Sequence, residues 1–323
     1  MNYIVFDLEW NQSNTEKEEV EVLPFEIIEI GAVKLSDDRT MVSRYDRLIK
    51  PQVYRKLHYM TQKLLHLEAD ELEKGIVFSD AVSQFLDWCG EDYIFCSWGP
   101  LDLTVLQKNM SYYNMTPLTE GPIAFYDVQK LFSLAYGNKK LRRSLEYAVD
   151  FLRIEKDIPF HRAFSDAYYT AKVFAAIRNA NVLAHMSYDV FTLPQNKEQE
   201  VFTVFDDYAK YITREFEDKA QIAADKQIMS SKCYLCHKNL KKKIKWFTPN
   251  GKHYYCVAEC DKHGLMKFKI RVRRSENHKL YVIKTIKFIG KDELEKIKEK
   301  KEHTQEIRRI RRKNKNHNQN SDI

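Results

Sequence analysis

The chain has 323 residues, of which 44% are hydrophobic and 13% aromatic, so it can bury a large core and exceeds the size of a typical single domain. With 9 glycines, 8 prolines and no apolar run of the roughly 18 residues that a membrane helix needs, we expect neither a fibrous nor a membrane protein. The net charge of +7 is divided unevenly: residues 1–231 carry −10, residues 232–291 carry +14 and residues 292–323 carry +3.

Apolar periodicity predicts how the first 180 residues fold. It indicates three strands over 3–10, 25–33 and 41–49, followed by helices over 54–67 and 79–89. Strands over 93–98 and 125–128 then alternate with helices over 101–113, 129–136, 143–152 and 163–178. This order predicts an α/β sheet that begins with a meander. The chain starts without a basic segment and reaches an acid at Asp7, so we expect no signal peptide and a cytoplasmic protein.

The C-terminal third has a different composition. A charged stretch over 199–228 predicts a long connecting helix, and the segment over 231–290 combines cysteines with β-forming residues. We therefore expect four parts, namely a body over 1–195, a helical linker over 196–230, a basic module over 231–291 and a charged helical or disordered tail over 292–323.

Two acids interrupt the first apolar strand. Asp7 and Glu9 are separated by one residue, and the period of two in a strand places both carboxylates on the same face. Neighbouring carboxylates repel each other unless a cation lies between them. A strand end that faces solvent is the alternative explanation.

Further candidates stand at the ends of later elements. Asp102 follows the buried strand 93–98 in the first turn of a helix, where the helix dipole alone would also favour it. Asp166 lies about one turn into the helix that follows His161, so its side chain points back at the sheet while His161 lies in a loop over the same place. Local capping and an ordinary surface histidine are the alternatives.

These four acids and one histidine fall at strand and helix ends, where an α/β sheet collects its active site. Carboxylates are the usual ligands of Mg²⁺ and Mn²⁺. Two such ions about 3.5–4 Å apart clamp the attacking and leaving oxygens of a phosphodiester. The combination therefore indicates phosphodiester chemistry.

The motifs Phe6-Asp7-Leu8-Glu9, Trp98-Gly99 before Asp102, and His161-x4-Asp166 resemble those of the DEDDh branch of the DnaQ-like 3′–5′ exonucleases. The resemblance extends over residues 1 to about 180, includes Glu29 to Val33, and is greatest to the subgroup that trims RNA 3′ ends. It implies a ribonuclease H-like mixed five-stranded sheet in the order 3-2-1-4-5, with strand 2 antiparallel to the others.

The resemblance also implies the chemistry. Two Mg²⁺ or Mn²⁺ ions would be held by four carboxylates, those of Asp7, Glu9, Asp102 and Asp166. His161 would be the general base. The terminal nucleotide would contact His58, Met60 and Thr61, which lie in a segment that resembles the one contacting this nucleotide in the family. The substrate would be single-stranded or 3′-overhanging RNA or DNA, with RNA slightly preferred.

Four of the six cysteines cluster in the basic module. Cys233 and Cys236 form one short pair, and Cys256 and Cys260 form another. Short pairs of this kind converge on a tetrahedral ion, so we expect one structural zinc in a zinc-ribbon-like module. His237, His253 and His263 are possible substitutes for a cysteine ligand, and free thiols or disulfides are the alternatives.

Basic and aromatic residues surround these cysteines. Such residues neutralise phosphates and stack on unpaired bases, so we predict nucleic-acid contacts; a solvated strand face is the alternative. The predicted contacts are Lys243, Lys245, Trp246, Lys269, Arg271 and Arg273. The function favoured is that of a 3′–5′ exonuclease, and the competing hypotheses are a polymerase proofreading subunit and a non-catalytic regulator that binds nucleic acid or a protein.

Overall fold

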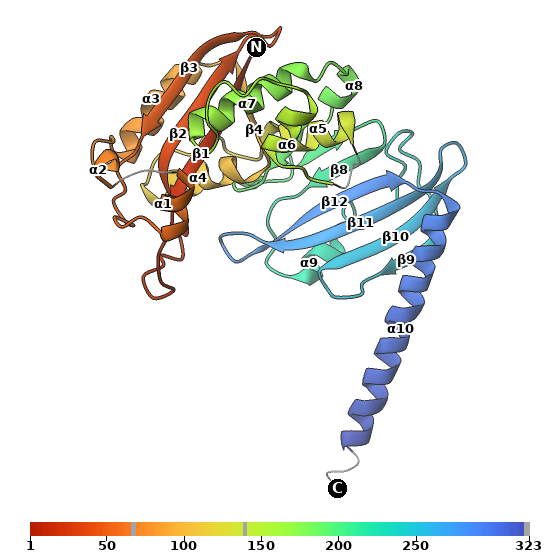
Figure 1. Ribbon diagram of the computed structural model, residues 1–323. Coiled ribbons are helices and arrows are strands. Elements are labelled where there is room, and N and C mark those ends of the chain that lie inside the picture. Colours follow the sequence, from red (N-terminus) through yellow and green to blue (C-terminus); the bar gives the residue numbers. More distant parts are fainter. Residues whose placement is uncertain (66–68, 138–140, 320–323) are drawn as a thin grey trace. The chain divides into compact units, whose positions relative to one another are not determined.

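The computed structural model describes residues 1–65, 69–137 and 141–319 (Figure 1). The chain divides into two compact units, Met1–Thr192 and Leu193–Ile323. None of the described helices has the length and apolar character needed to span a bilayer.

The first unit contains a mixed six-stranded sheet in the order β3-β2-β1-β4-β5-β6. Its strands are β1 (Asn2–Asn11), β2 (Glu26–Leu35), β3 (Met41–Leu48), β4 (Tyr93–Ser97), β5 (Ile123–Asp127) and β6 (Ser187–Asp189). Strand β1 is antiparallel to β2 and parallel to β4, which confirms the expected order and the antiparallel second strand. Strand β6 was not predicted, because three residues are too few for a periodic signal.

Helices cover both faces of this sheet (Figure 1). They are α1 (Tyr59–Leu65), α2 (Ala69–Leu72), α3 (Phe78–Cys89), α4 (Leu101–Tyr112), α5 (Val128–Tyr136), α6 (Leu145–Phe151), α7 (Ala163–Ala176) and α8 (Ala180–Leu183). On β1, Phe6 and Leu8 pack against α3 and α4, whereas Val5 packs against α5, α6 and α7. The alternation of β1 therefore separates two halves of the core.

The helix expected over 54–67 begins only at Tyr59, and residues 66 and 67 lie outside the described part of the chain. Tertiary hydrogen bonds hold the preceding segment extended. The buried side chain of Asn11 donates to the carbonyl oxygens of Tyr54 and Lys56 at 2.7 and 2.9 Å. The buried carboxylate of Glu26 accepts the N–H of Tyr54 at 2.6 Å.

The second unit contains another six-stranded sheet, in the order β7-β8-β12-β11-β10-β9. Its elements are β7 (Val201–Val204), β8 (Tyr208–Ile212), α9 (Lys219–Ala224), β9 (Lys241–Phe247), β10 (His253–Cys260), β11 (Gly264–Arg274), β12 (Leu280–Phe288) and α10 (Lys291–Gln319). Chain segment 216–240 covers one face of the sheet, where Phe216, Ile228 and Tyr234 join the cores.

The long helix expected over 199–228, and with it the helical linker over 196–230, is wrong. Residues 201–212 of that stretch form a hairpin of β7 and β8, in which the Phe205 N–H donates to the Tyr208 carbonyl at 2.8 Å across the turn, and the helix in it is the short α9. The many charges suggested a solvated helix, but Val201, Thr203 and Val204 are β-branched, and the pairing with β12 stabilises the extended form.

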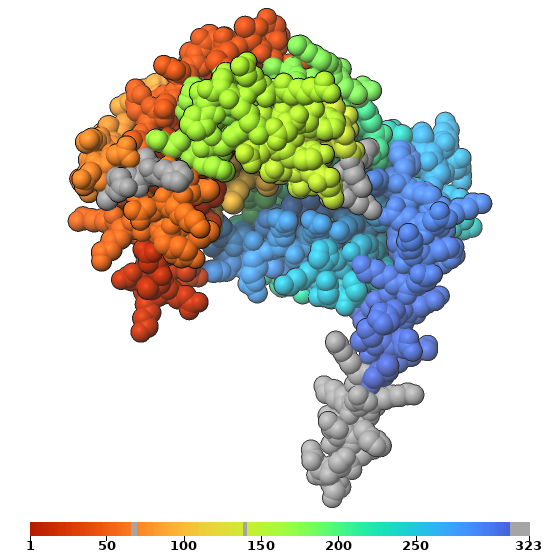
Figure 2. All heavy atoms as spheres, in the orientation of Figure 1, coloured from red at the N-terminus to blue at the C-terminus, as the bar shows by residue number. Residues whose placement is uncertain are grey.

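The charged tail is helical as α10, with residues 320–323 outside the described range. Ile297 of α10 packs with Ile244 and Val257 on the sheet face opposite segment 216–240. Figure 2 shows the blue atoms of this helix against the lighter blue and cyan atoms of the same unit.

Candidate active site and candidate metal centre

Strand β1 supplies the first two acids. Because Ile4, Phe6 and Leu8 point into the core on one face of the sheet, Asp7 and Glu9 lie on the face covered by α7. The sequence-based prediction that the two carboxylates share a face agrees with this register.

Helix α7 brings Asp166 to the same place, and a glycine permits it. Gly31 of β2 is the cross-strand neighbour of Asp7. A Cβ atom added at Gly31 would lie 1.9 Å from the backbone nitrogen of Phe164, in the first turn of α7. The helix therefore approaches the sheet at a distance that only glycine allows, and the carboxylate oxygens of Asp7, Glu9 and Asp166 lie within 4.8 Å of one another.

Asp102 lies in the first turn of α4, near Asp7 but outside the three acids whose carboxylate oxygens lie within 4.8 Å of one another. Its side chain is 6% exposed. Burial raises its pKa to about 7, although the backbone N–H groups of Asp102 and Leu8 favour the charged form. Burial, and then the charge of Asp102, raise the pKa of Asp7 well above its ordinary value.

Glu9 carries the same electrostatic stress. Burial, followed by the charges of Asp166 and Glu29, raises its pKa to about 8, and the Arg162 guanidinium partly opposes this rise. Asp102 is buried and the other three acids are half-buried, and the raised pKa values of all four disfavour their ionisation, so a cation placed among them would relieve the repulsion. The donor set, all carboxylate oxygens, fits Mg²⁺ or Mn²⁺.

Arg162 and Glu29 form an ion pair beside the carboxylate group. The sequence did not identify this pair as functional. The Arg162 Nε donates to the buried Glu29 carboxylate at 3.0 and 3.2 Å. Glu29 lies directly opposite Glu9 on β2. An acid at the centre of the apolar run 26–33 was the available signal.

His161 precedes Arg162 in the same loop. Its backbone adopts a left-handed conformation with φ 68°, and its N–H donates to the Asp166 carboxylate at 3.3 Å. The imidazole is exposed. The loop is thus tied to the carboxylate group on one side and to Glu29 on the other, while the ring remains accessible.

The segment expected to contact the terminal nucleotide lies at the end of β1. The Thr61 hydroxyl donates to the Trp10 carbonyl at 3.4 Å, and the buried Asn11 accepts the N–H of His58 at 2.8 Å. Met60 is 53% exposed, whereas His58 is buried. Asn11 and Glu26, which anchor this segment, were also missed from the sequence.

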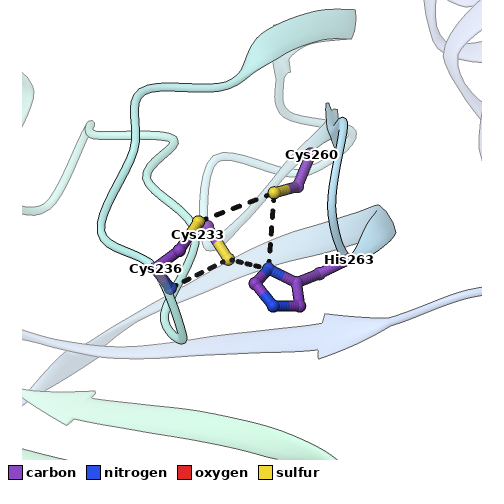
Figure 3. A group of neighbouring side chains, drawn as sticks. All are labelled: Cys233, Cys236, Cys260 and His263. Carbon is purple, nitrogen blue, oxygen red and sulfur yellow. Dashed lines mark hydrogen bonds between the residues drawn. The ribbon is translucent and has the colours of Figure 1, made fainter.

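A second group that can hold a metal ion lies in the second unit (Figure 3). The Nδ1 atom of His263 is 3.3 Å from the Cys233 sulfur and 3.5 Å from the Cys260 sulfur, and the sulfurs of Cys236 and Cys260 are 3.7 Å apart. Tetrahedral zinc with bonds of about 2.3 Å to sulfur and 2.0–2.1 Å to nitrogen separates its ligand atoms by roughly 3.5–3.8 Å. The four side chains therefore fit zinc.

Cys256, predicted as the fourth ligand, lies outside this group. Both Cys256 and Cys260 are in β10, and four residues of strand extend about 13 Å. The two sulfurs therefore cannot contact one ion, and Cys256 is buried in the core instead. His263 stands three residues after Cys260, beyond the end of the strand, while His237 and His253 are outside the group.

The predicted nucleic-acid contacts do not all lie together. Lys269, Arg271 and Arg273 project from one face of β11, because Phe268, Ile270 and Val272 fill the core on the other face. Trp246 packs in that core, and its Nε1 donates to the Met229 carbonyl at 2.9 Å, so its ring is not presented with the β11 charges. Lys245 is exposed, and Lys243 pairs with Glu259 at 2.5 Å.

A group of half-buried carboxylates on a central strand and the helix that covers it is typical of metal-dependent hydrolases of phosphate esters. A family model described as exonuclease, RNase_T, matches residues 4–174, more than half of the chain. The chain belongs to this family of exonucleases and is a hydrolytic nuclease, which confirms the resemblance seen in the sequence. No curated protein matches the chain significantly.

Solved structures similar to part of this chain include the following three proteins. The nuclease domain of 3′hExo, a DEDDh family member bound to rAMP, has 15% identity and a TM-score of 0.47 over 54% of this chain and 90% of that one. Cell-death related nuclease 4 (CRN-4) has 14% identity and a TM-score of 0.47 over 74% of this chain and 87% of that one. S. pombe Pop2p, in a form with bound Mg²⁺ and Mn²⁺, has 18% identity and a TM-score of 0.43 over 55% of this chain and 83% of that one.

Substituting Gly31 by alanine should separate α7 from the sheet. The added methyl group would meet backbone rather than a flexible side chain, so we expect a loss of roughly 1–3 kcal/mol or more in the free energy of unfolding and a large loss of nuclease activity. Gly121→Ala is the matched control, because a Cβ at Gly121 meets nothing within 4 Å. Wild-type stability of Gly31→Ala in denaturant unfolding would contradict the close approach.

Divalent cations should stabilise the protein more at higher pH. The pKa of Glu9 is about 8 in the folded protein, against an ordinary value of 4.5, so without a cation the folded state holds a proton that the unfolded chain has lost. Stability therefore falls as the pH rises through this window, and a cation that replaces the proton offsets the fall. We expect a larger increase in Tm on adding Mn²⁺ at pH 8 than at pH 5, measured by scanning fluorimetry.

Glu9→Gln tests the origin of this effect. Without added cation the variant should be more stable than the wild type at pH 8 but not at pH 5, and it should lose most of the Mn²⁺ response. The matched control is Glu91→Gln, at an exposed position outside the group. A Mn²⁺ response of equal size at both pH values in the wild type would show that these carboxylates do not bind the ion.

Proposed function

We propose that the protein is a metal-dependent 3′–5′ exonuclease of single-stranded or 3′-overhanging nucleic acid, with RNA slightly preferred over DNA. The observation that carries the proposal is the convergence of Asp7, Glu9 and Asp166 within 4.8 Å, beside the buried Asp102. Carboxylate oxygens of this kind suit Mg²⁺ and Mn²⁺. The preference for RNA rests on the sequence that leads to Asp102, Ser97-Trp98-Gly99.

In this proposal the four carboxylates hold two Mg²⁺ or Mn²⁺ ions. Such ions, when bound, supply charge neutralisation at the phosphodiester and polarise the attacking water. The His161 ring accepts the proton of that water, a role suited to an exposed imidazole in a loop fixed beside Asp166. Met60 and Thr61 contact the terminal nucleotide, and the buried His58 positions them, since its Nδ1 accepts the Met60 N–H at 3.3 Å.

The second unit would hold the rest of the strand. Lys269, Arg271 and Arg273 form a row on β11, and the Nζ atoms of Lys269 and Lys300 lie 6.0 and 4.4 Å from the centroid of the Tyr255 ring. Positive groups alternating with an aromatic ring suit a single strand, whose phosphates pair with the cations while its bases stack.

One structural zinc ion in the second unit belongs to the same proposal. Its ligands would be Cys233, Cys236, Cys260 and His263, whose ligand atoms lie within 4.8 Å of one another. Zinc would fasten the segment 231–240 to the end of β10, because the two pairs come from these two places.

A non-catalytic regulator that keeps the fold is the second candidate. It is favoured by the size of the second unit, which has a sheet as large as that of the nuclease unit. A regulator would gain nothing from four neighbouring acids with raised pKa values, which cost stability when no cation is bound.

Exonuclease activity can be tested with oligonucleotides labelled at either end. With Mn²⁺ or Mg²⁺, a 5′-labelled strand should shorten stepwise, while a 3′-labelled strand should release a labelled mononucleotide at once. Asp7→Asn should abolish both. A fragment pattern from internal cuts, or early release of the 5′ label, would contradict the direction, and inactivity of the wild type on RNA and DNA would favour the regulator.

His161→Ala should reduce turnover by roughly 10²–10⁴-fold, the usual contribution of a positioned general base. The matched control is His303→Ala, at an exposed position of α10. Both variants should still bind Mn²⁺, which is measured by the shift in Tm on adding the ion. Loss of the shift in His161→Ala would make His161 a metal ligand instead.

The zinc assignment predicts which cysteine matters. Purified wild type should contain one zinc per chain by elemental analysis, Cys260→Ser should lose it, and Cys256→Ala should keep it despite some loss of stability from the core. If Cys260→Ser does not fold, titration of the wild type with a thiol-specific mercurial should release one zinc. Loss of zinc from Cys256→Ala as well as from Cys260→Ser, with retention of zinc by His263→Ala, would restore the ligand set expected from sequence.

A further inference from the structure

A large cavity opens on the sheet face of the second unit opposite the β11 charges. Its volume is about 1070 Å³, at the upper end of ligand pockets in general. Lys284 and Ile286 of β12 contribute to its wall, and they pair across the sheet with Ile270 and Phe268, which face away from Lys269. The cavity is therefore separate from the surface proposed above.

The lining of this cavity is positively charged. It contains five lysines and, among the described residues that form it, no acid: Lys197, Lys226, Lys232, Lys242 and Lys284. Four of them have no ion pair within the described parts of the chain, whereas the Lys284 ammonium donates to the carbonyl oxygens of Gln227 and Ser230 at 3.0 and 2.9 Å. Cations without a counter-charge around one cavity attract an anion.

The same cavity offers apolar and aromatic walls. Phe202, on the edge strand β7, is 45% exposed, and its ring meets that of Tyr211 at a centroid distance of 6.3 Å. Met229 and Leu240 add apolar surface. A purely inorganic anion would not use these walls, whereas a planar ring would stack on them.

One polar group in the lining lacks a partner. Tyr234 is 3% exposed, and its hydroxyl makes no hydrogen bond among the described residues. An unsatisfied buried hydroxyl costs about 1–3 kcal/mol, and Tyr234 lines the cavity. A ligand that supplies a donor or acceptor there would remove this cost.

We propose that the cavity binds a nucleotide, with its phosphate on the lysines and its base against the aromatic wall and the Tyr234 hydroxyl. The choice of a nucleotide over another aromatic anion rests on the proposed nuclease function. The nucleotide is either an unpaired unit of a bound strand or a free mononucleotide, since the two share the chemistry that the cavity recognises.

The test uses the full chain with Asp7→Asn, which does not degrade the probe, and follows binding of a short fluorescein-labelled single strand across a salt series. Lys226→Ala with Lys242→Ala should weaken binding by about tenfold, and the log–log salt slope should fall by about 0.7, the contribution of the one phosphate that the cavity lysines would contact. The matched control is Lys291→Ala with Lys296→Ala, two exposed lysines of α10 that lie outside the cavity lining.

Tyr234→Phe separates ligand binding from folding. It removes only the unsatisfied hydroxyl, so its Tm and zinc content should be unchanged or higher while the affinity for the nucleotide falls. Photolabelling with 8-azidoadenosine monophosphate, followed by peptide mapping, identifies the source. Labelling within 197–242 with unchanged strand affinity indicates a free nucleotide, and weakened strand binding without such labelling indicates a unit of the strand.

Wild-type strand binding in all cavity variants, with no labelling within 197–242, would overturn the proposal. Hydrolysis of a dinucleotide by the same cavity variants, with Asp7 restored, keeps the two proposals apart. Unchanged hydrolysis and unchanged strand binding in the cavity variants would support the exonuclease activity and reject the nucleotide site. Absence of hydrolysis in the wild type, with strand binding that still depends on the cavity, would support the nucleotide site and reject the exonuclease activity.

Discussion

The mutual repulsion of buried carboxylates is the constraint on which the first unit depends. Asp7 and Glu9 lie on a central strand, and α7 adds Asp166 at a distance that a side chain at Gly31 would prevent. Burial is the largest cause of the raised pKa of each acid in the group. The fold therefore holds charges together that would separate in a flexible chain. The free energy of their repulsion would be recovered when a cation is bound, and so would add to the affinity for that cation.

A single guanidinium moderates this repulsion. Arg162 pairs with the buried Glu29, directly across the sheet from Glu9, and lowers the pKa of Glu9 against the other causes. The same residue follows His161 in the chain, so the ion pair also fixes one end of the loop that presents the imidazole. Electrostatic compensation and positioning of the proposed base thus depend on one contact.

Alternation along β1 was enough to predict the shared face of Asp7 and Glu9, whereas the order of the first five strands was implied by the resemblance to the exonuclease family. Segment 54–58 was not predictable, because hydrogen bonds from Asn11 hold it extended. The β7–β8 hairpin was hidden by its charges. Cys256 lies outside the metal-binding group because the cysteine spacing was interpreted without the rise of a strand. His263 was named only as one of three possible substitutes, and its C-x2-H spacing after Cys260 was the signal that favoured it.

The division of charge along the chain follows from the same electrostatics. A site of four acids, in a stretch 1–231 with a net charge of −10, repels a polyanion everywhere except where bound cations reverse the sign. The net charge of +14 on residues 232–291 attracts a polyanion at long range. Salt screens both this attraction and the repulsion from the acidic stretch over roughly 8–10 Å. Cations inside the carboxylate group are screened far less. Under the proposed function, rising ionic strength should therefore weaken the binding of a long strand before it weakens the binding of metal ions. The dependence of activity on strand length and the hydrolysis itself should then respond separately to salt.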